Sequence, residues 1–329
     1  MFRRLLVPLD GSDLAEQALP HAAAIARASE SELDLVLVHT PTPFDGFDDP
    51  GWNAKELEAQ GHYVQSTANE LSAGAGIPVT CAVMTGDKAD MICARAFDVG
   101  ADLIVMTSHG RTGLSRAWLG SVADAVLRHS SVPILMLRPL QTKADLFAAP
   151  HVFTHILVPL DGSPLAAEAL TPAVALAKAR GASITLLRVV VEVPLLLNDA
   201  GVPFVYANPL VPSDSAATAR LIDVAKSDLE DVTRALKAQG IVDVQAAVVV
   251  NTHIAPAIIK FARAHGVDMI AMSTHGRGTS RLFLGSIADK VIRASELPML
   301  VYRPVEALVK GERERASTFR VPPPALAPG

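Results

Sequence analysis

The sequence predicts an α/β fold with two tandem Rossmann-like domains, each a five-stranded sheet flanked by helices. The first observation is an internal repeat, because LLVPLDGS at 5–12 returns as ILVPLDGS at 156–163. The second is the alternation of short apolar runs with amphipathic segments along both copies, which is typical of a parallel sheet covered by helices. The third is the length of 329 residues, which is sufficient for two domains with substantial cores.

Each copy begins with a short apolar strand that ends at an Asp-Gly-Ser turn. Ser12 and Ser163 are placed to cap the helices that follow, and Pro164 falls at the favoured first helical position. Alanine-rich segments with an apolar stripe predict one helix at 13–28 and its counterpart at 164–180.

The remaining elements follow in the same order in both copies. Second strands are predicted at 33–39 and 183–190, where near-continuous apolar runs indicate burial on both faces. The later elements are helices at 53–73 and 214–239, strands at 79–84 and 244–250, helices at 88–98 and 254–264, strands at 102–106 and 268–272, helices from Ser121 and Ser286, and strands at 133–137 and 298–302. The predicted domains are 1–139 and 154–304, joined by a linker at 140–153 and followed by a disordered Pro-rich tail at 305–329.

A glycine-punctuated loop after the fourth strand is the main candidate for a binding site. The first copy reads MTSHG at 106–110, then nine residues, then Gly120-Ser121, and the second reads MSTHG at 272–276, then eight residues, then Gly285-Ser286. Gly110 allows close backbone approach, and the helix that starts after Gly120 offers free N–H groups that favour an anion. A phosphate cradle is one interpretation. The other is purely structural, because Ser121 with Asp124 and Ser286 with Asp289 fit a capping-box pattern.

The acidic residue at the end of each first strand also has two interpretations. Asp10 and Asp161 are either turn residues bonded to their own backbone, or carboxylates that accept hydrogen bonds from a ribose or hold a metal beside phosphates. His109 and His275 lie inside the glycine loops, and the sequence pairs neither with a visible nucleophile, which favours a structural role over a catalytic one.

Composition excludes several classes of function. A net charge of −5 without a cluster of Lys and Arg argues against a nucleic-acid partner. The two cysteines, Cys81 and Cys93, lack metal-ligand spacing and are expected to be buried, inert thiols in a reducing compartment. No apolar run reaches membrane-spanning length and the N-terminus does not read as a signal peptide, so no membrane contact and a cytoplasmic location are expected.

With these motifs, the chain resembles two universal stress protein domains in tandem, over nearly its whole length except the tail. The signature is Gly-x-x-Gly, nine residues, then Gly followed by Ser or Thr, with Thr107 standing at the first glycine here. The resemblance implies an adenine nucleotide alpha hydrolase-like domain with strand order 3-2-1-4-5. It also implies ATP, ADP or AMP at the strand ends, with the opening aspartate on the ribose, the end of the second strand on adenine, and the glycine loop on the phosphates. The implied residues are Pro8, Asp10, Thr40, Gly86, Met106, Thr107, His109, Gly110, Gly120, Ser121 and Val122 in the first copy, and Pro159, Asp161, Val189, Met272, Ser273, His275, Gly276, Gly285, Ser286 and Ile287 in the second.

The second copy departs from the signature. Ser273 replaces the first glycine, Asn251 replaces the glycine equivalent to Gly86, and the loop is one residue shorter. Asn tolerates a left-handed backbone, so that exchange is expected to be mild. The shortening moves every later N–H group, which favours the first copy as the ATP site.

Three functions are consistent with the sequence. The preferred one is an ATP-holding stress-response module with little or no turnover, because neither copy has a Walker-type Gly-Lys-Ser/Thr. The alternatives are a slow ATPase or a protein that phosphorylates itself on Ser121 or Ser286, with Mg²⁺ as an optional companion, and a nucleotide-independent interaction module. The resemblance further implies a pseudo-dimer within the chain through the strands at 133–137 and 298–302, and leaves a homodimer open.

Overall fold

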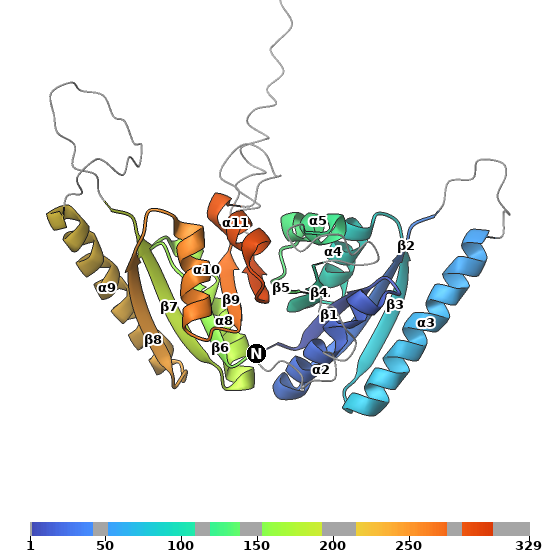
Figure 1. Ribbon diagram of the computed structural model, residues 1–329. Coiled ribbons are helices and arrows are strands. Elements are labelled where there is room, and N and C mark those ends of the chain that lie inside the picture. The colour runs from blue at the N-terminus through green and yellow to red at the C-terminus, as the bar shows by residue number, and fades with distance from the viewer. Residues whose placement is uncertain are drawn as a thin grey trace, which may run out of the picture.

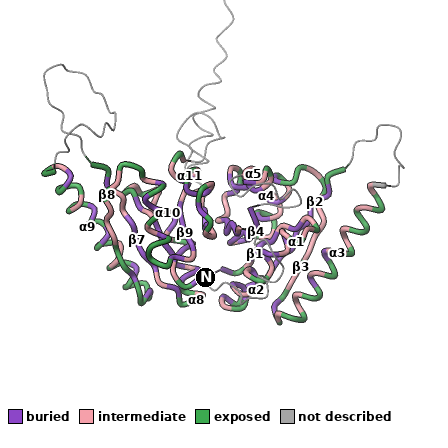
Figure 2. The backbone as a smooth tube through the Cα atoms, viewed as in Figure 1, coloured by how far each residue is buried: buried purple, intermediate pink, exposed green. Residues whose placement is uncertain are grey.

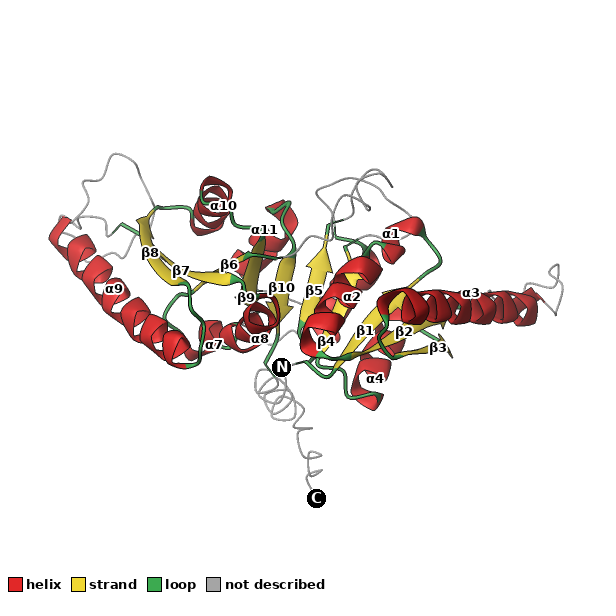
Figure 3. Ribbon diagram, turned by 90° about the horizontal axis from the view of Figure 1, so that it is seen from below, coloured by secondary structure: helices red, strands yellow, loops and turns green. Residues whose placement is uncertain are grey.

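A computed structural model of the protein describes residues 2–41, 52–108, 119–138, 153–192, 215–274 and 285–304. The ten strands form one sheet in the order β3-β2-β1-β4-β5-β10-β9-β6-β7-β8. The strands run continuously through the middle of the molecule, with helices on both sides (Figures 1 and 3). Each half therefore has the strand order 3-2-1-4-5 implied by the resemblance, and the α/β fold with two tandem copies is confirmed.

The elements of the two halves correspond one to one. The first half contains β1 (Arg4–Leu9), α1 (Asp13–Glu16), α2 (Ala18–Ser29), β2 (Glu32–His39), α3 (Trp52–Ala75), β3 (Val79–Thr85), α4 (Lys88–Asp98), β4 (Leu103–Thr107), α5 (Ser121–His129) and β5 (Ile134–Leu137). The second contains β6 (His155–Pro159), α7 (Pro164–Ala167), α8 (Leu170–Arg180), β7 (Ser183–Val190), α9 (Ser215–Ala238), β8 (Val244–Val250), α10 (Ile254–Ala264), β9 (Met269–Ser273), α11 (Ser286–Ala294) and β10 (Met299–Tyr302). The predicted linker, except for its last residue Phe153, and the predicted tail lie outside the described residues.

The first helix of each copy is broken, contrary to the prediction of one continuous helix. α1 ends at Glu16 and α2 begins at Ala18, while α7 ends at Ala167 and α8 begins at Leu170. Each break lies about one turn before a proline, Pro20 or Pro172. Proline has no N–H for the carbonyl four residues earlier, and its ring crowds that carbonyl, so the helix is interrupted there.

The strands bury alternate side chains on opposite faces of the sheet. Leu5 and Val7 belong to the core beneath α2, α3, α8 and α9, whereas Leu6 belongs to the core beneath α4, α5, α10 and α11. Each core contains residues from both halves of the chain. Figure 2 shows buried residues along the strands and exposed ones on the outer surfaces of α3 and α9.

The two halves are joined edge to edge through their fifth strands. β5 and β10 pair antiparallel, with Leu135 opposite Leu300 and both nearly inaccessible to solvent. On one face α2 lies against α8, and the Arg180 guanidinium donates to the carbonyl of Ala24 at 3.0 Å. The pseudo-dimer expected within one chain is therefore formed by the expected strands.

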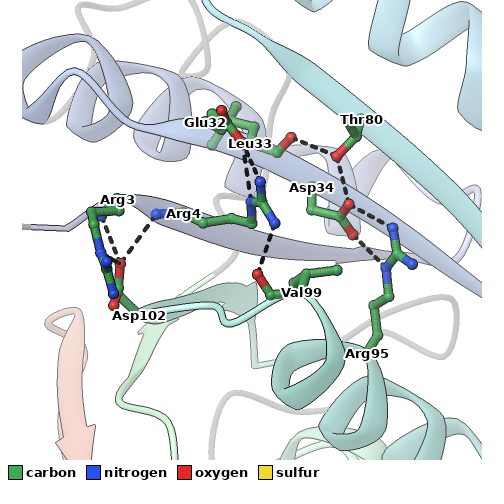
Figure 4. Close-up of polar contacts among 9 residues, drawn as sticks. All are labelled: Arg3, Arg4, Glu32, Leu33, Asp34, Thr80, Arg95, Val99 and Asp102. Carbon is green, nitrogen blue, oxygen red and sulfur yellow. Dashed lines mark hydrogen bonds and ion pairs between the residues drawn. The ribbon is translucent and has the colours of Figure 1, made fainter.

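A buried ion pair holds β2, β3 and α4 together in the first half (Figure 4). The Asp34 side chain on β2 is 1% exposed and receives bonds of 2.8 and 2.7 Å from the Arg95 guanidinium. The Thr80 hydroxyl on β3 donates to the same carboxylate at 2.6 Å. Just before β1, the backbone N–H of Arg3 donates to the carboxylate of Asp102 at 2.6 Å.

Both cysteines are free thiols and are only partly buried, rather than fully buried as predicted. Burial raises the pKa of Cys81, and it raises that of Cys93 to about 11. Thiols with raised pKa values are poor nucleophiles near neutral pH, which agrees with the predicted inertness. Within the described ranges, no helix is long and apolar enough to cross a membrane.

Candidate functional site

The Asp-Gly-Ser turns adopt the same geometry in both halves. Oδ1 of Asp10 accepts from the Ser12 backbone N–H at 3.0 Å and from its hydroxyl at 2.6 Å, and Asp161 accepts from Ser163 at 2.9 and 2.6 Å. Both serines then cap the next helix, as predicted. The turn interpretation of the two aspartates is therefore correct for one carboxylate oxygen of each, and it fixes each carboxylate at the end of its strand.

The fourth strands lead into the glycine loops from buried positions. In the first half Met106 and Thr107 are each 6% exposed, and the Gly120 N–H donates to the Ser108 carbonyl at 2.8 Å. In the second half Met272 is 7% exposed, and the Ser273 hydroxyl donates to the Leu165 carbonyl on α7 at 2.5 Å. The predicted residues His109, Gly110, His275 and Gly276 lie outside the described residues.

The helices after the glycine loops start without a side-chain cap. Gly120 and Gly285 are the N-cap residues, and Ser121 and Ser286 are exposed first residues of α5 and α11. The capping-box interpretation is therefore wrong. The two aspartates of the expected capping boxes form ion pairs instead. Asp124 pairs with Arg128 and Arg293, and Asp289 pairs with Arg293. Among the described residues, no side chain caps the N–H groups at the start of either helix, which suits these groups to a ligand or water.

A cavity of about 840 Å³ lies at the carboxyl ends of β6, β7 and β9. It is bounded by the first turns of α7 and α11 and by one side of α10. Every predicted second-copy residue that the structure describes lines it, namely Pro159, Asp161, Val189, Met272, Ser273, Gly285, Ser286 and Ile287. The structure thus brings together residues spread over more than 120 positions of the sequence, in the copy that the sequence did not favour.

Sequence reasoning missed the apolar wall and the cationic end of this cavity. Leu187 alternates with Val189 on β7, and Ile254 and Ile258 lie one turn apart on α10, so strand and helix periodicity could have identified all three missed residues. Lys290 and Arg293 follow the glycine loop on α11. Arg128 belongs to the first half of the chain, and no local pattern could have assigned it to the second.

The expected residues of the first half occupy the corresponding strand ends. Pro8 and Asp10 lie at the end of β1, Met106 and Thr107 end β4, and Gly120, Ser121 and Val122 start α5. Two expectations about how the copies match need correction.

The first correction concerns the end of the second strand. Pro8 lies opposite Val36 and Pro159 lies opposite Leu187, so Val189 corresponds to Val38 and not to Thr40. Thr40 lies one residue beyond β2, where its hydroxyl is 3.4 Å from the Gly86 carbonyl. The two predicted adenine contacts are therefore not equivalent positions.

The second correction concerns Gly86 and Asn251. Their N–H groups make equivalent bonds, to the carbonyls of His39 and Val190. Gly86 has φ +149, whereas Glu30 alone among the described non-glycine residues has a positive φ, so Asn251 is not left-handed. The connecting segments also differ in length, because three residues separate β8 from α10 and only two separate β3 from α4.

Acidic and basic side chains alternate where α5 and α11 meet. Arg128 makes a two-bond contact with Asp124 at 2.7 and 3.1 Å, and Arg293 reaches the same carboxylate at 3.2 Å as well as Asp289 at 2.9 Å. The hydrogen bond to Asp124 raises the pKa of Arg128. An ion pair between Asp124 and Arg293 thus links the two halves of the chain at this junction.

The strand order, the repetition and the cavity at the strand ends define a tandem α/β protein of the class that binds ligands where the winding direction of a parallel sheet reverses. The chain belongs to the universal stress protein family, whose sequence profile matches residues 1–138 and 153–303.

Two shorter relatives support this assignment, and one solved structure shares the fold. A universal stress protein of Methanocaldococcus jannaschii is 30% identical over 141 residues, which cover 42% of this chain and 83% of the relative. The protein YxiE of Bacillus subtilis is 31% identical over 150 residues, covering 42% of this chain and all of the relative. A solved universal stress protein from Archaeoglobus fulgidus is 22% identical with a TM-score of 0.64, covers 92% of this chain and 96% of its own, and therefore shares the two-domain fold.

Proposed function

We propose that the chain is an adenine-nucleotide-binding stress-response module that holds ATP, ADP or AMP with little or no turnover. The observation that carries the proposal is the cavity of about 840 Å³ at the strand ends of the second half, into which the start of α11 opens. Its size suits a ligand of nucleotide dimensions, because small-molecule sites commonly measure about 300–1,000 Å³.

The cavity is lined by both apolar and charged side chains, which supports a nucleotide as the ligand. One side is apolar, with Leu187, Val189 and Ile258 offering contact to a flat base. Asp161 lies at the end of β6, where a carboxylate can accept hydrogen bonds from ribose hydroxyls.

The phosphates are assigned to the start of α11. Gly285 presents no side chain there and Ser286 is exposed, so backbone N–H groups, a hydroxyl and the positive end of the helix dipole all face an anion. The same arrangement at Gly120 and Ser121 in α5 leads us to propose a second nucleotide in the first half.

Slow turnover follows from the residues present in the sequence. Neither copy has the Gly-Lys-Ser/Thr of a Walker loop, whose lysine neutralises charge during phosphoryl transfer. Among the described residues, no group of three or more His, Cys, Asp or Glu is placed to hold a metal. Mg²⁺, where it takes part, would enter with the phosphates. A homodimer and a cytoplasmic location also belong to this proposal.

The test combines a content assay with titration calorimetry. Chain purified from cells is denatured and the released nucleotide is identified and counted, and nucleotide-free chain is titrated with ATP. Ser286→Glu places a negative charge at the proposed phosphate site and should remove one binding event per chain. The matched control is Ser215→Glu, because Ser215 is likewise the exposed first residue of a helix but does not line the cavity.

Two results would contradict the proposal. Chain that carries no nucleotide and gives no heat with ATP would leave the nucleotide-independent alternative standing. Steady release of labelled phosphate from ATP with Mg²⁺, or labelled protein, would instead support an enzyme. Unchanged binding by Ser286→Glu would move the site away from α11.

A further inference from the structure

The cavity of the second half contains one side chain from the first half. Arg128 lies in the last turn of α5 and reaches the cavity because β5 and β10 place α5 beside α11. Figure 1 shows the two helices next to each other above the junction of the sheet. The cavity therefore spans the boundary between the two domains.

The Arg128 guanidinium is held in a defined orientation. Asp124, one helical turn earlier, accepts from its Nε at 2.7 Å and from its Nη2 at 3.1 Å. The side chain is only 19% exposed, so it is largely shielded from solvent screening. A planar guanidinium fixed in this way has remaining N–H donors, and its geometry suits phosphate oxygens.

The other cationic side chains of the cavity that the structure describes both come from α11. Lys290 and Arg293 of α11 line the cavity together with Arg128, against the carboxylates of Asp161 and Asp289. Asp161 follows β6, two residues beyond its last residue, Pro159. Three described cationic side chains thus line the cavity, of which Arg128 and Arg293 are paired with Asp124.

We propose that Arg128, carried by the first domain, binds the phosphates of the ligand held by the second domain. This rests on the proposed nucleotide function and adds to it a composite site that the second domain cannot complete alone. The expected preference is for ligands that carry phosphate, because a guanidinium pairs with phosphate oxygens.

Arg128 is not needed to dock the two domains. Docking is provided by the strand pair β5–β10 and by two reciprocal contacts, in which Arg138 donates to the carbonyls of Ile292 and Ser295 and Arg303 donates to the backbone carbonyl of Arg128. None of these uses the Arg128 side chain. If Arg128 is removed, Asp124 keeps Arg293 as a partner at 3.2 Å.

The experiment measures ligand binding to the full chain in a Ser121→Glu background, so that the heat comes from the second site. In that background Arg128→Met should weaken ATP about 10- to 100-fold, as expected for the loss of a charge-assisted hydrogen bond. Binding of adenosine, which has no phosphate, should not change. Arg128→Lys should recover part of the loss, since it restores a charge without the fork.

The matched control is Arg263→Met. Arg263 also pairs with a carboxylate, that of Glu296 at 3.3 Å, but it does not line the cavity, and ATP affinity should stay at the background value. Equal ATP affinity for Arg128→Met and the background chain would overturn the composite site and leave the proposed function intact. So would an equal loss for ATP and adenosine, which would indicate a structural role. A wild-type chain and a background chain that both fail to bind ATP would overturn the proposed function and this inference together.

Discussion

Replacing Arg95 by methionine should destabilise the first domain strongly, because it leaves the carboxylate of Asp34 without its counter-charge. The Asp34 side chain is 1% exposed and keeps a single described donor, the Thr80 hydroxyl at 2.6 Å. Breaking a buried ion pair by removing one partner typically costs about 3–5 kcal/mol. Arg95 is 25% exposed, so water can enter after the change, and we expect a loss of about 3 kcal/mol, at the lower end of that range.

The measurement is urea unfolding followed by tryptophan fluorescence. Both tryptophans, Trp52 and Trp118, belong to the first domain, so the signal reports the half that contains the ion pair. The free energy of unfolding is obtained by linear extrapolation, with the slope compared between variants. Arg3→Met is the control, because Arg3 is 88% exposed and 3.9 Å from Asp102, and exposed pairs of this kind contribute about 0–1 kcal/mol.

A paired variant tests the physical reason. Asp34→Leu combined with Arg95→Met removes both charges, and apolar replacements of a buried pair are often neutral or stabilising. We expect the double variant to recover most of the stability lost by Arg95→Met. A loss of less than about 1 kcal/mol in the free energy of unfolding of Arg95→Met, the scale of an exposed pair, would contradict this prediction. So would a double variant that is no more stable than Arg95→Met.

Three further predictions concern the domain junction and the thiols. Arg138→Ala and Arg303→Ala each remove a cation from the carboxyl end of a helix in the other domain. Each should weaken docking of the two domains by about 1–2 kcal/mol and split one unfolding transition into two, and a single unchanged transition in both variants would contradict this. Leu135→Ala, at a fully buried position of β5, should cost about 3 kcal/mol through lost burial and a cavity, measured by the same unfolding assay, and a loss no larger than that of an exposed alanine substitution would count against it. Burial raises the pKa of Cys93 to about 11 from an ordinary value of 9.0, so the folded chain holds its proton longer than the unfolded chain, and stability should fall as pH rises from about 9 to about 11. Cys93→Ala should show a shallower fall over that pH range, and a fall as steep as that of the wild type would refute the assignment.

The length of the glycine loop ranks the two candidate nucleotide sites, and that ranking stays a prediction. The second loop is one residue shorter than the first, and this difference favoured the first copy. The structure shows an added residue between β8 and α10 and a cavity that gathers all described second-copy residues of the prediction. Loop length alone could not show which side chains line the cavity, because these come from several different elements.

The sequence by itself determined the repeat, the order of strands and helices, and the positions where strands end. These depend on local physics: apolar periodicity selects strand or helix, Asp-Gly-Ser dictates a turn, and Ser12 and Ser163 cap the helices that they precede. It also contained Pro20 and Pro172, whose effect on the first helices was local and could have been predicted.

Only the tertiary structure decided which groups meet. Asp124 fits a capping box in the sequence, yet its carboxylate pairs with Arg128 and with Arg293, which is 169 residues away. A carboxylate that could either cap a helix or pair with two guanidinium groups bonds to the groups that the fold brings within hydrogen-bond distance. Sequence spacing does not give the distance in space between Asp124 and Arg293. For the same reason Arg128 enters the cavity of the other domain only because β5 and β10 pair edge to edge.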